Sequence, residues 1–497
     1  MYITTTIPYV NARPHLGHAL ELVQADVLAR HHRRRGEPVR FQTGTDDNSL
    51  KNVLAAEAEG VPVRELVDRN AAAFEGLRGP LDLSFDSFIR TSAHPGHRPG
   101  VERVWQATAH DLYTRHYEGL YCVGCEQFYP QGPCPDGHEA PLQPVSEVNW
   151  FFRLSRYRDA LLDLIGGGRL RVEPAARRNE VLAFLRAGLD DISVSRSAAR
   201  ARGWGIPVPG DPGQVVYVWW DALANYVTAL GGGDYERWWE REARKVHLVG
   251  KGVIRFHAVY WPAMLLSAGL PLPTAIFVHD YLTADGRKIS KSSGNAADPV
   301  ALVDAYGVDA VRWWLLREVP RVGDADFTEA RLVARADQDL AGGLGNLVSR
   351  VTVMVGRFLD GHVPPAGEPL AEVAEPVHEA LEDFDFRRAA GAVWGLVEEA
   401  NKFVELTRPW QQDTAGRERS LGALVHACRA LAVQLEPFLP TAAARVAAAV
   451  GGTRLSRSEP LFPRLGEGRA PRSGRPAAVL RPGEGRPDGG GTRRRSG

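Results

Sequence analysis

A short segment near the N-terminus holds residue types that suit phosphate chemistry. It reads Pro14-His15-Leu16-Gly17-His18, with two histidines flanking a glycine at the start of an expected helix. A helix N-terminus presents unpaired N–H groups and the positive end of the helix dipole. Imidazole rings placed there can donate to a triphosphate, and glycine lets a nucleotide approach the backbone closely. Taken alone, the segment is more typical of an ordinary helix start.

A second segment, Lys288-Ile289-Ser290-Lys291-Ser292, follows the turn signal Asp285-Gly286 and is read as a basic loop. Flexible ammonium groups can follow charge on a phosphate during its transfer. The chain has 60 basic residues, yet only six are lysines, and two of those six lie in this loop. A solvated basic loop is the alternative when the segment is considered by itself. Together the segments predict a nucleotide site whose binding residues are His15, Gly17, His18, Lys288, Ser290, Lys291 and Ser292, with His15, His18, Lys288 and Lys291 catalytic.

Three of the four cysteines, Cys122, Cys125 and Cys134, lie close together and are followed by His138. Thiolates and an imidazole at such spacing fit tetrahedral zinc, and four protein ligands would give a closed, structural site. A disulfide pair with a spare cysteine is the alternative, which a cytoplasmic chain disfavours.

The segments that must position these residues alternate between strand and helix. Residues 2–7 (YITTTI) and 39–43 (VRFQT) read as strands, and residues 16–35 between them show apolar residues at helical spacing. Such β-α-β order predicts a parallel sheet, which binds ligands beyond the carboxyl ends of its strands. The loops 8–15 and 44–49 lie at such ends.

Length and composition bound the class of protein. The chain has 497 residues, 44% of them hydrophobic, with 60 basic and 60 acidic residues. We therefore expect several globular domains. There is no apolar run of membrane-spanning length and no basic, then apolar start typical of a secretion signal, so we expect a cytoplasmic protein without a membrane span.

The two motifs, in this order, resemble the HIGH and KMSKS signatures of class I aminoacyl-tRNA synthetases. Flanking segments narrow the resemblance to methionyl-tRNA synthetases over about residues 1–440: TTTIPYVNARPHLGHAL, GTDD, NEVLAFLRAGLDDISVSR, WGIPVPGDP, VVYVWWDALANYV and FHAVYWPAML. The resemblance implies an α/β fold: a Rossmann-like parallel-sheet catalytic domain, split by a zinc-knuckle insertion and followed by a C-terminal α-helical bundle. The expected boundaries are 1–112 and 215–275 for the catalytic halves, 113–214 for the insertion, 276–328 for a stem-contact region with the KISKS loop, 329–455 for a helical anticodon-binding domain and 456–497 for a mostly disordered tail.

The resemblance also implies a substrate set and residue roles. Asp46 would hold the ammonium of L-methionine, and ATP would bind with Mg²⁺ at the two motifs. The full methionine site would consist of Ile7, Tyr9, Asp46, Trp219, Tyr226 and His257. Trp219 and Tyr226 would, without the surrounding segments, read as plain core. Residues Asn346, Arg350 and Trp410 would read the anticodon of tRNA(Met), with helix packing or capping as the alternative.

The implied activity is ligation of methionine to tRNA through methionyl-adenylate, by a monomer. Cysteine, valine, leucine and isoleucine enzymes share both motifs, but their editing insertions or zinc ligands fit this chain poorly. Two other hypotheses remain: a degenerate paralogue that binds tRNA or methionine as a regulator, and an enzyme that delivers activated methionine to a non-tRNA acceptor.

The chain departs from the family pattern at two places. Asn48-Ser49 stands where the family generally has His-Gly, and Gly252 stands where it usually has an aspartate. Loss of a hydrogen-bonding carboxylate at a nucleotide site costs about 1–3 kcal/mol. We therefore predict weakened or altered catalysis, as would suit a divergent second copy with a specialised or inhibitor-tolerant role.

Overall fold

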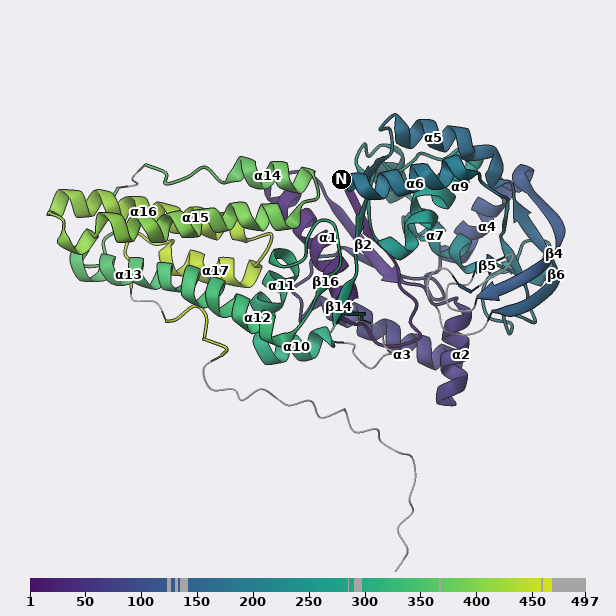
Figure 1. The fold of residues 1–497 in the computed structure, drawn as a ribbon, viewed down its shortest axis with the longest axis horizontal. Coiled ribbons are helices and arrows are strands. Elements are labelled where there is room, and N and C mark those ends of the chain that lie inside the picture. The colour runs from purple at the N-terminus through teal and green to yellow at the C-terminus, as the bar shows by residue number, and fades with distance from the viewer. Residues whose placement is uncertain are drawn as a thin grey trace, which may run out of the picture.

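The computed structural model describes residues 1–122, 127–129, 133–134, 142–284, 286–289, 297–365, 368–456 and 459–466. Figure 1 shows an elongated molecule, with an α/β part at one end and a bundle of long helices at the other. No helix among these residues is long and apolar enough to cross a membrane.

A six-stranded sheet forms the centre of the α/β part, and all its neighbouring strands are parallel. Its order is β3 (Ser87–Arg90), β2 (Arg40–Thr45), β1 (Tyr2–Thr5), β12 (Lys245–Gly250), β13 (Ala275–His279) and β7 (Arg171–Glu173). In the register of the central strands, Ile3 lies beside Phe41 and Val246. The direction of winding reverses between β1 and β12, the position at which such sheets bind ligands. The expected parallel α/β fold is confirmed.

Helices cover both faces of this sheet. Successive residues of a strand point to opposite faces, so neighbouring residues pack into different cores. Phe277 of β13 belongs to the core shared with α1 (Leu16–Arg34) and α11 (Val308–Arg317). Its neighbours Ile276 and Val278 belong to the core shared with α4 (His97–Ala107), α7 (Val218–Thr228) and α9 (Trp261–Ala268). Next to β2 and β3 lie α2 (Leu50–Glu59) and α3 (Val63–Glu75).

The segment expected as an insertion, 113–214, holds most of a second sheet. Its long hairpin pairs β4 (Leu112–Cys122) with β6 (Gln143–Phe152), and β5 (Gln127–Tyr129) and β8 (Ile192–Ser193) flank them. A small sheet of β9 (Ser195–Ser197), β10 (Pro207–Val208) and β11 (Asp211–Val216) follows α5 (Arg158–Gly166) and α6 (Ala175–Ala187). The same segment supplies β7, the edge strand of the main sheet. The domain boundaries themselves stay a prediction.

After the main sheet, the chain forms a small sheet and then helices. Strands β14 (Leu282–Ala284), β15 (Arg287–Lys288) and β16 (Ala325–Asp326) precede or flank α10 (Pro299–Tyr306). The bundle consists of α12 (Glu329–Arg335), a π-helical stretch (Ala336–Gly345), α13 (Asn346–Leu359), α14 (Ala374–Glu382), α15 (Phe386–Thr407), α16 (Thr414–Leu435) and α17 (Pro440–Val450). This confirms the expected helical C-terminal region.

The beginning of the expected tail packs on the bundle. Leu461 is buried, and the backbone N–H of Leu465 donates to Asp337 at 2.6 Å. Residues 467–497, the Gly-, Pro- and Arg-rich remainder for which we expected disorder, lie outside the described residues.

A buried arginine joins the α/β part to the bundle. The guanidinium of Arg312, on α11, is fully buried and donates to Asp26 of α1 at 2.8 Å. It also donates to the backbone carbonyls of Phe438 (2.8 Å) and Leu81 (2.9 Å). Full burial of a charge requires such complete pairing.

Candidate active site

The two histidines of the N-terminal motif lie at the first turn of α1. The backbone N–H of Gly17 donates to Nδ1 of His15, and that of His15 donates to Nδ1 of His18, both at 3.1 Å. The two rings stack with centroids 3.8 Å apart. Because each Nδ1 accepts a hydrogen bond, each neutral ring carries its proton on Nε2, as a donor to phosphate requires. A Cβ on Gly17 would lie 2.9 Å from the His15 ring, so this arrangement needs glycine.

The backbone around the KISKS motif contacts the same helix start. Ile289 is buried and its N–H donates to the carbonyl of Leu282 at 3.1 Å, which fixes the beginning of the loop. Beyond the motif, the carbonyl of Ala297 accepts from the N–H of Leu16 at 3.0 Å. The described residue five positions beyond the motif therefore lies at the first turn of α1. Residues Ser290, Lys291 and Ser292, and the side chain of Lys288, lie outside the described part of the structure.

Aromatic residues expected to bind methionine lie around α7. The rings of Trp219 and Phe256 stack at 3.7 Å, and Tyr9 lies 6.0 Å from Trp219. Farther along α7, the hydroxyl of Tyr226 contacts Nε2 of His257 at 2.7 Å. Sequence reasoning did not select Phe256, although it directly precedes His257.

The Tyr226–His257 pair is buried and uncharged. Burial raises the pKa of Tyr226 well above its ordinary value and lowers that of His257 to about 4. Nδ1 of His257 faces the carbonyl of Val253 at 2.9 Å and must donate to it, so Nε2 accepts from the tyrosine hydroxyl. A neutral polar pair among aromatic rings suits an uncharged, polarizable side chain such as a thioether.

Two further expected residues lie where β1 ends. Asp46 is buried, and its N–H donates to the carbonyl of Pro8 at 3.0 Å, which places it beside Tyr9. Ile7 packs with Ala222 of α7. The hydroxyl oxygen of Tyr226 also lies 3.3 Å from the carbonyl oxygen of Thr5. All six expected methionine residues therefore surround the carboxyl end of β1 and one helix, α7.

A buried ion pair that the sequence did not reveal lies at the same edge of the sheet. Glu21 of α1 accepts from the N–H of Thr6 at 2.7 Å and from Nε2 of His279, at the end of β13, at 2.8 Å. Nδ1 of His279 faces the carbonyl of Asp280 at 2.9 Å. Burial lowers the pKa of His279, but the bond to Glu21 and its charge raise it more, so the net shift is upward. Both ring nitrogens face acceptors, which requires a doubly protonated ring.

Gly252, the position of the expected aspartate, lies against a tyrosine. A Cβ on Gly252 would lie 2.1 Å from the hydroxyl of Tyr281. The neighbouring Lys251 lies over the ring of Tyr281, 4.6 Å from its centroid, and its Nζ donates to Asp324 at 2.5 Å. The hydroxyl of Tyr281, which lies between β13 and β14, thus occupies the space next to the end of β12.

Two of the four expected zinc ligands belong to the described residues. Cys122 ends β4 and is fully buried, and Cys134 is also buried. Cys125 and His138 fall outside the described ranges. Among the residues that are described, no group of three or more histidine, cysteine or acidic side chains has the geometry to hold a metal ion.

The residues expected to read an anticodon lie on the bundle. Asn346 begins α13 and is exposed. Arg350, one turn later, pairs with Glu405 near the end of α15 at 2.7 Å. Trp410 follows α15 and exposes 41% of its surface. An exposed indole and an arginine at the same end of two helices can stack on and bond to bases.

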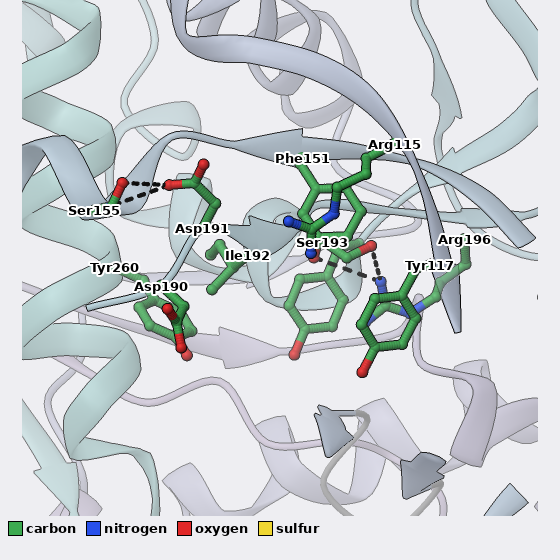
Figure 2. A pocket seen from close by; sticks show the side chains of 11 residues that line it. Arg115, Tyr117, Phe151, Ser155, Asp190, Asp191, Ile192, Ser193, Arg196 and Tyr260 are labelled. Atoms are coloured by element: carbon green, nitrogen blue, oxygen red, sulfur yellow. Dashed lines mark hydrogen bonds between the residues drawn. The ribbon is translucent and has the colours of Figure 1, made fainter. Parts of the chain in front are cut away.

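A cavity of about 510 Å³ lies between the β4–β6 hairpin and the α/β part. Figure 2 shows Arg115 beside Phe151, and Tyr117 near Arg196. The Arg115 guanidinium lies 4.1 Å from the Phe151 centroid. The lining also includes Tyr217, which directly precedes α7, and Tyr260, three residues after His257. The cavity therefore combines cationic and aromatic side chains with two acidic ones, Asp190 and Asp191.

Comparisons with known proteins agree with this arrangement. The chain matches the family described as tRNA synthetases class I (M) over residues 1–141 and 137–352. It is 39% identical to the methionine–tRNA ligase of Brucella suis, over 94% of this chain and 98% of that protein. It is 40% identical to that of Mycobacterium bovis, over 92% and 93%. A solved structure of Mycobacterium tuberculosis methionyl-tRNA synthetase in complex with methionyl-adenylate superposes with a TM-score of 0.86 at 37% identity, over 93% of this chain and 99% of that one. The chain belongs to the methionyl-tRNA synthetase family of the class I tRNA synthetases.

Proposed function

We propose that this chain is a methionine–tRNA ligase, which activates L-methionine with ATP and transfers the methionyl group to tRNA(Met). The observation that carries the proposal is the neutral Tyr226–His257 pair beside the stacked Trp219 and Phe256, at the sheet edge that also holds the histidines of α1. This combination supports an uncharged thioether substrate next to a triphosphate.

In the first step, a carboxylate oxygen of methionine attacks the α-phosphorus of ATP. The new O–P bond forms as the bond to the bridging oxygen breaks, and pyrophosphate leaves with the electron pair. His15 and His18 donate to phosphate oxygens from the start of α1, where Gly17 allows close approach. Lys288 and Lys291, with the hydroxyls of Ser290 and Ser292, neutralise charge on the leaving phosphates. Mg²⁺ enters as part of the ATP substrate.

Alignment supplies the catalysis, and no enzyme nucleophile is needed. Asp46 binds the methionine ammonium, while Ile7, Tyr9, Trp219, Tyr226 and His257 enclose the side chain. In the second step, a ribose hydroxyl of the terminal tRNA adenosine attacks the methionyl carbonyl carbon, and AMP leaves.

We propose that the tRNA contacts the helical bundle with its anticodon and the α/β part with its acceptor end. Asn346, Arg350 and Trp410 would contact the anticodon. The cavity at Arg115 and Phe151 would receive the single-stranded acceptor end, because stacking faces and guanidinium groups bind such strands without base pairing. The protein would act in the cytoplasm as a monomer, which light scattering can test.

A zinc ion would be structural. The buried thiols of Cys122 and Cys134 fit such a donor set, since buried thiolates bind zinc with tetrahedral geometry. With Cys125 and His138 they would close the site and hold the end of the hairpin, without a role in the reaction. Metal analysis of the purified protein should find about one zinc per chain.

Exchange of labelled pyrophosphate into ATP, measured with each of the twenty amino acids, tests the proposal. We expect exchange with methionine alone, followed by charging of initiator and elongator tRNA(Met). Exchange without charging would favour delivery of methionine to another acceptor. Absence of exchange together with retained tRNA or methionine binding would overturn the proposal in favour of a regulatory paralogue.

A further inference from the structure

We propose that Asn48 is a positioning residue of the ammonium subsite, which fixes Asp46 relative to helix α7 through Asp221. The inference rests on the proposed function, because it takes Asp46 as the group that binds the methionine ammonium.

Asn48 donates hydrogen bonds to two aspartates, Asp46 and Asp221. Its backbone N–H donates to Oδ1 of Asp46 at 3.2 Å. Its side-chain amide donates to Oδ2 of Asp221 at 2.6 Å. Asp46 and Asp221 each expose 1% of their surface, and Asn48 between them is half-buried. The side chain thereby fixes the backbone group that orients the Asp46 carboxylate.

Asp221 is itself held firmly. Its other oxygen, Oδ1, accepts from Nε2 of the fully buried His97, and the hydroxyl of Thr228 contacts Nδ1 of that ring at 2.6 Å. A carboxylate with a donor on each oxygen has little freedom to turn. Since Asp221 lies on α7 between Trp219 and Tyr226, the loop with Asp46 is tied to the helix that lines the side-chain pocket.

The substitution supplies a donor that does not titrate. An amide donates to Asp221 at every pH, whereas an imidazole changes its charge near pH 6.5. The next residue also has a defined role, since the hydroxyl of Ser49 accepts from the N–H of Lys51 at 3.0 Å and caps α2. A glycine at that position would lack this cap. Asn48-Ser49 is therefore a consistent replacement for the family pair.

The test compares two ligands that differ only in the amine: L-methioninol and 4-(methylthio)butan-1-ol. Dissociation constants are measured by ligand-observed NMR titration on the full chain, which needs no catalysis. For Asn48→Ala we expect methioninol to bind about tenfold more weakly, as for one lost hydrogen bond, with the deaminated ligand unchanged. Asn48→Asp, which opposes Asp221 with a second carboxylate, should lose at least as much. Asn48→His should restore amine-dependent binding.

Asn179→Ala, at an exposed position of α6, is the matched control and should leave both constants unchanged. Equal weakening of both ligands in the Asn48 variants would mean general damage to the pocket and would overturn the inference, as would no weakening at all. These results differ from failure of the proposed function, which shows as a parent protein without methionine-dependent pyrophosphate exchange. A parent that binds both ligands equally would overturn the ammonium subsite itself.

Discussion

Replacement of Glu21 by glutamine should abolish a pH-dependent part of the protein's stability. In the parent, the carboxylate accepts from a doubly protonated His279 at 2.8 Å, in a site where both side chains are buried. Glutamine has nearly the same shape, and its NH2 group can donate to Nε2 of a neutral His279 whose Nδ1–H still donates to Asp280. The hydrogen bonds persist while both charges disappear.

The sign follows from the raised pKa of His279. A group whose pKa is raised on folding stabilises the folded state fully below its unfolded pKa, about 6.5 for histidine. That contribution is lost as the pH rises through the folded pKa. Each unit of upward shift corresponds to about 1.4 kcal/mol. The parent should therefore lose stability above pH 6.5 by a component that Glu21→Gln lacks.

Urea denaturation followed by tryptophan fluorescence at pH 6 to 9 measures this component. Glu21→Ala, which removes the acceptor of the Thr6 N–H and the carboxylate partner of Nε2 of the buried His279, should instead lose about 3–5 kcal/mol near neutral pH. Glu399→Gln, at an exposed position of α15, is the matched control. If the parent and Glu21→Gln lost stability in parallel between pH 6.5 and 9, the assigned charge state of His279 would be wrong.

Three further predictions concern the proposed reaction. Lys291→Ala should slow methionine-dependent pyrophosphate exchange by at least about a hundredfold, because it removes charge stabilisation of the leaving phosphates. Methioninol binding should be retained. Exchange at the parental rate would contradict the role of this loop. Gly252→Asp should raise the KM for ATP, because its Cβ would lie 2.1 Å from the Tyr281 hydroxyl. Adding Tyr281→Phe should bring the KM back down. A gain in ATP affinity by Gly252→Asp alone would refute the clash. Arg115→Ala should lower kcat/KM for tRNA charging about tenfold, as for one lost base-stacking contact, and leave pyrophosphate exchange unchanged. The control Arg98→Ala, at an exposed position of α4, should affect neither assay.

Local patterns were sufficient to predict the parallel sheet and the helical C-terminal region. Residues 2–7 and 16–35 form β1 and α1 with ends that differ by only a few residues, since β-branched runs and apolar spacing act over short distances. The strand β7 was missed, because its three residues lie within the expected insertion and join the sheet only through pairing with β13.

The site depends more on contacts between distant residues. Glu21 and His279 are 258 positions apart, and Asn48 and Asp221 are 173 apart. No periodicity in the sequence connects such pairs, because their contact depends on how strands and helices pack. Gly252 illustrates the same limit: the sequence showed a missing carboxylate, whereas only the folded chain places the Tyr281 hydroxyl beside it.

The buried Arg312 bears on how the chain can be divided. Truncation before the bundle would remove the carbonyl of Phe438, which accepts from this guanidinium, and expose its bond to Asp26. Asp26 lies on the same helix whose first turn carries His15 and His18, so solvent would reach the middle of the helix on which we propose the nucleotide site. We therefore expect a fragment that ends after α11 to lose its cooperative melting transition, even though its sheet would be complete in sequence.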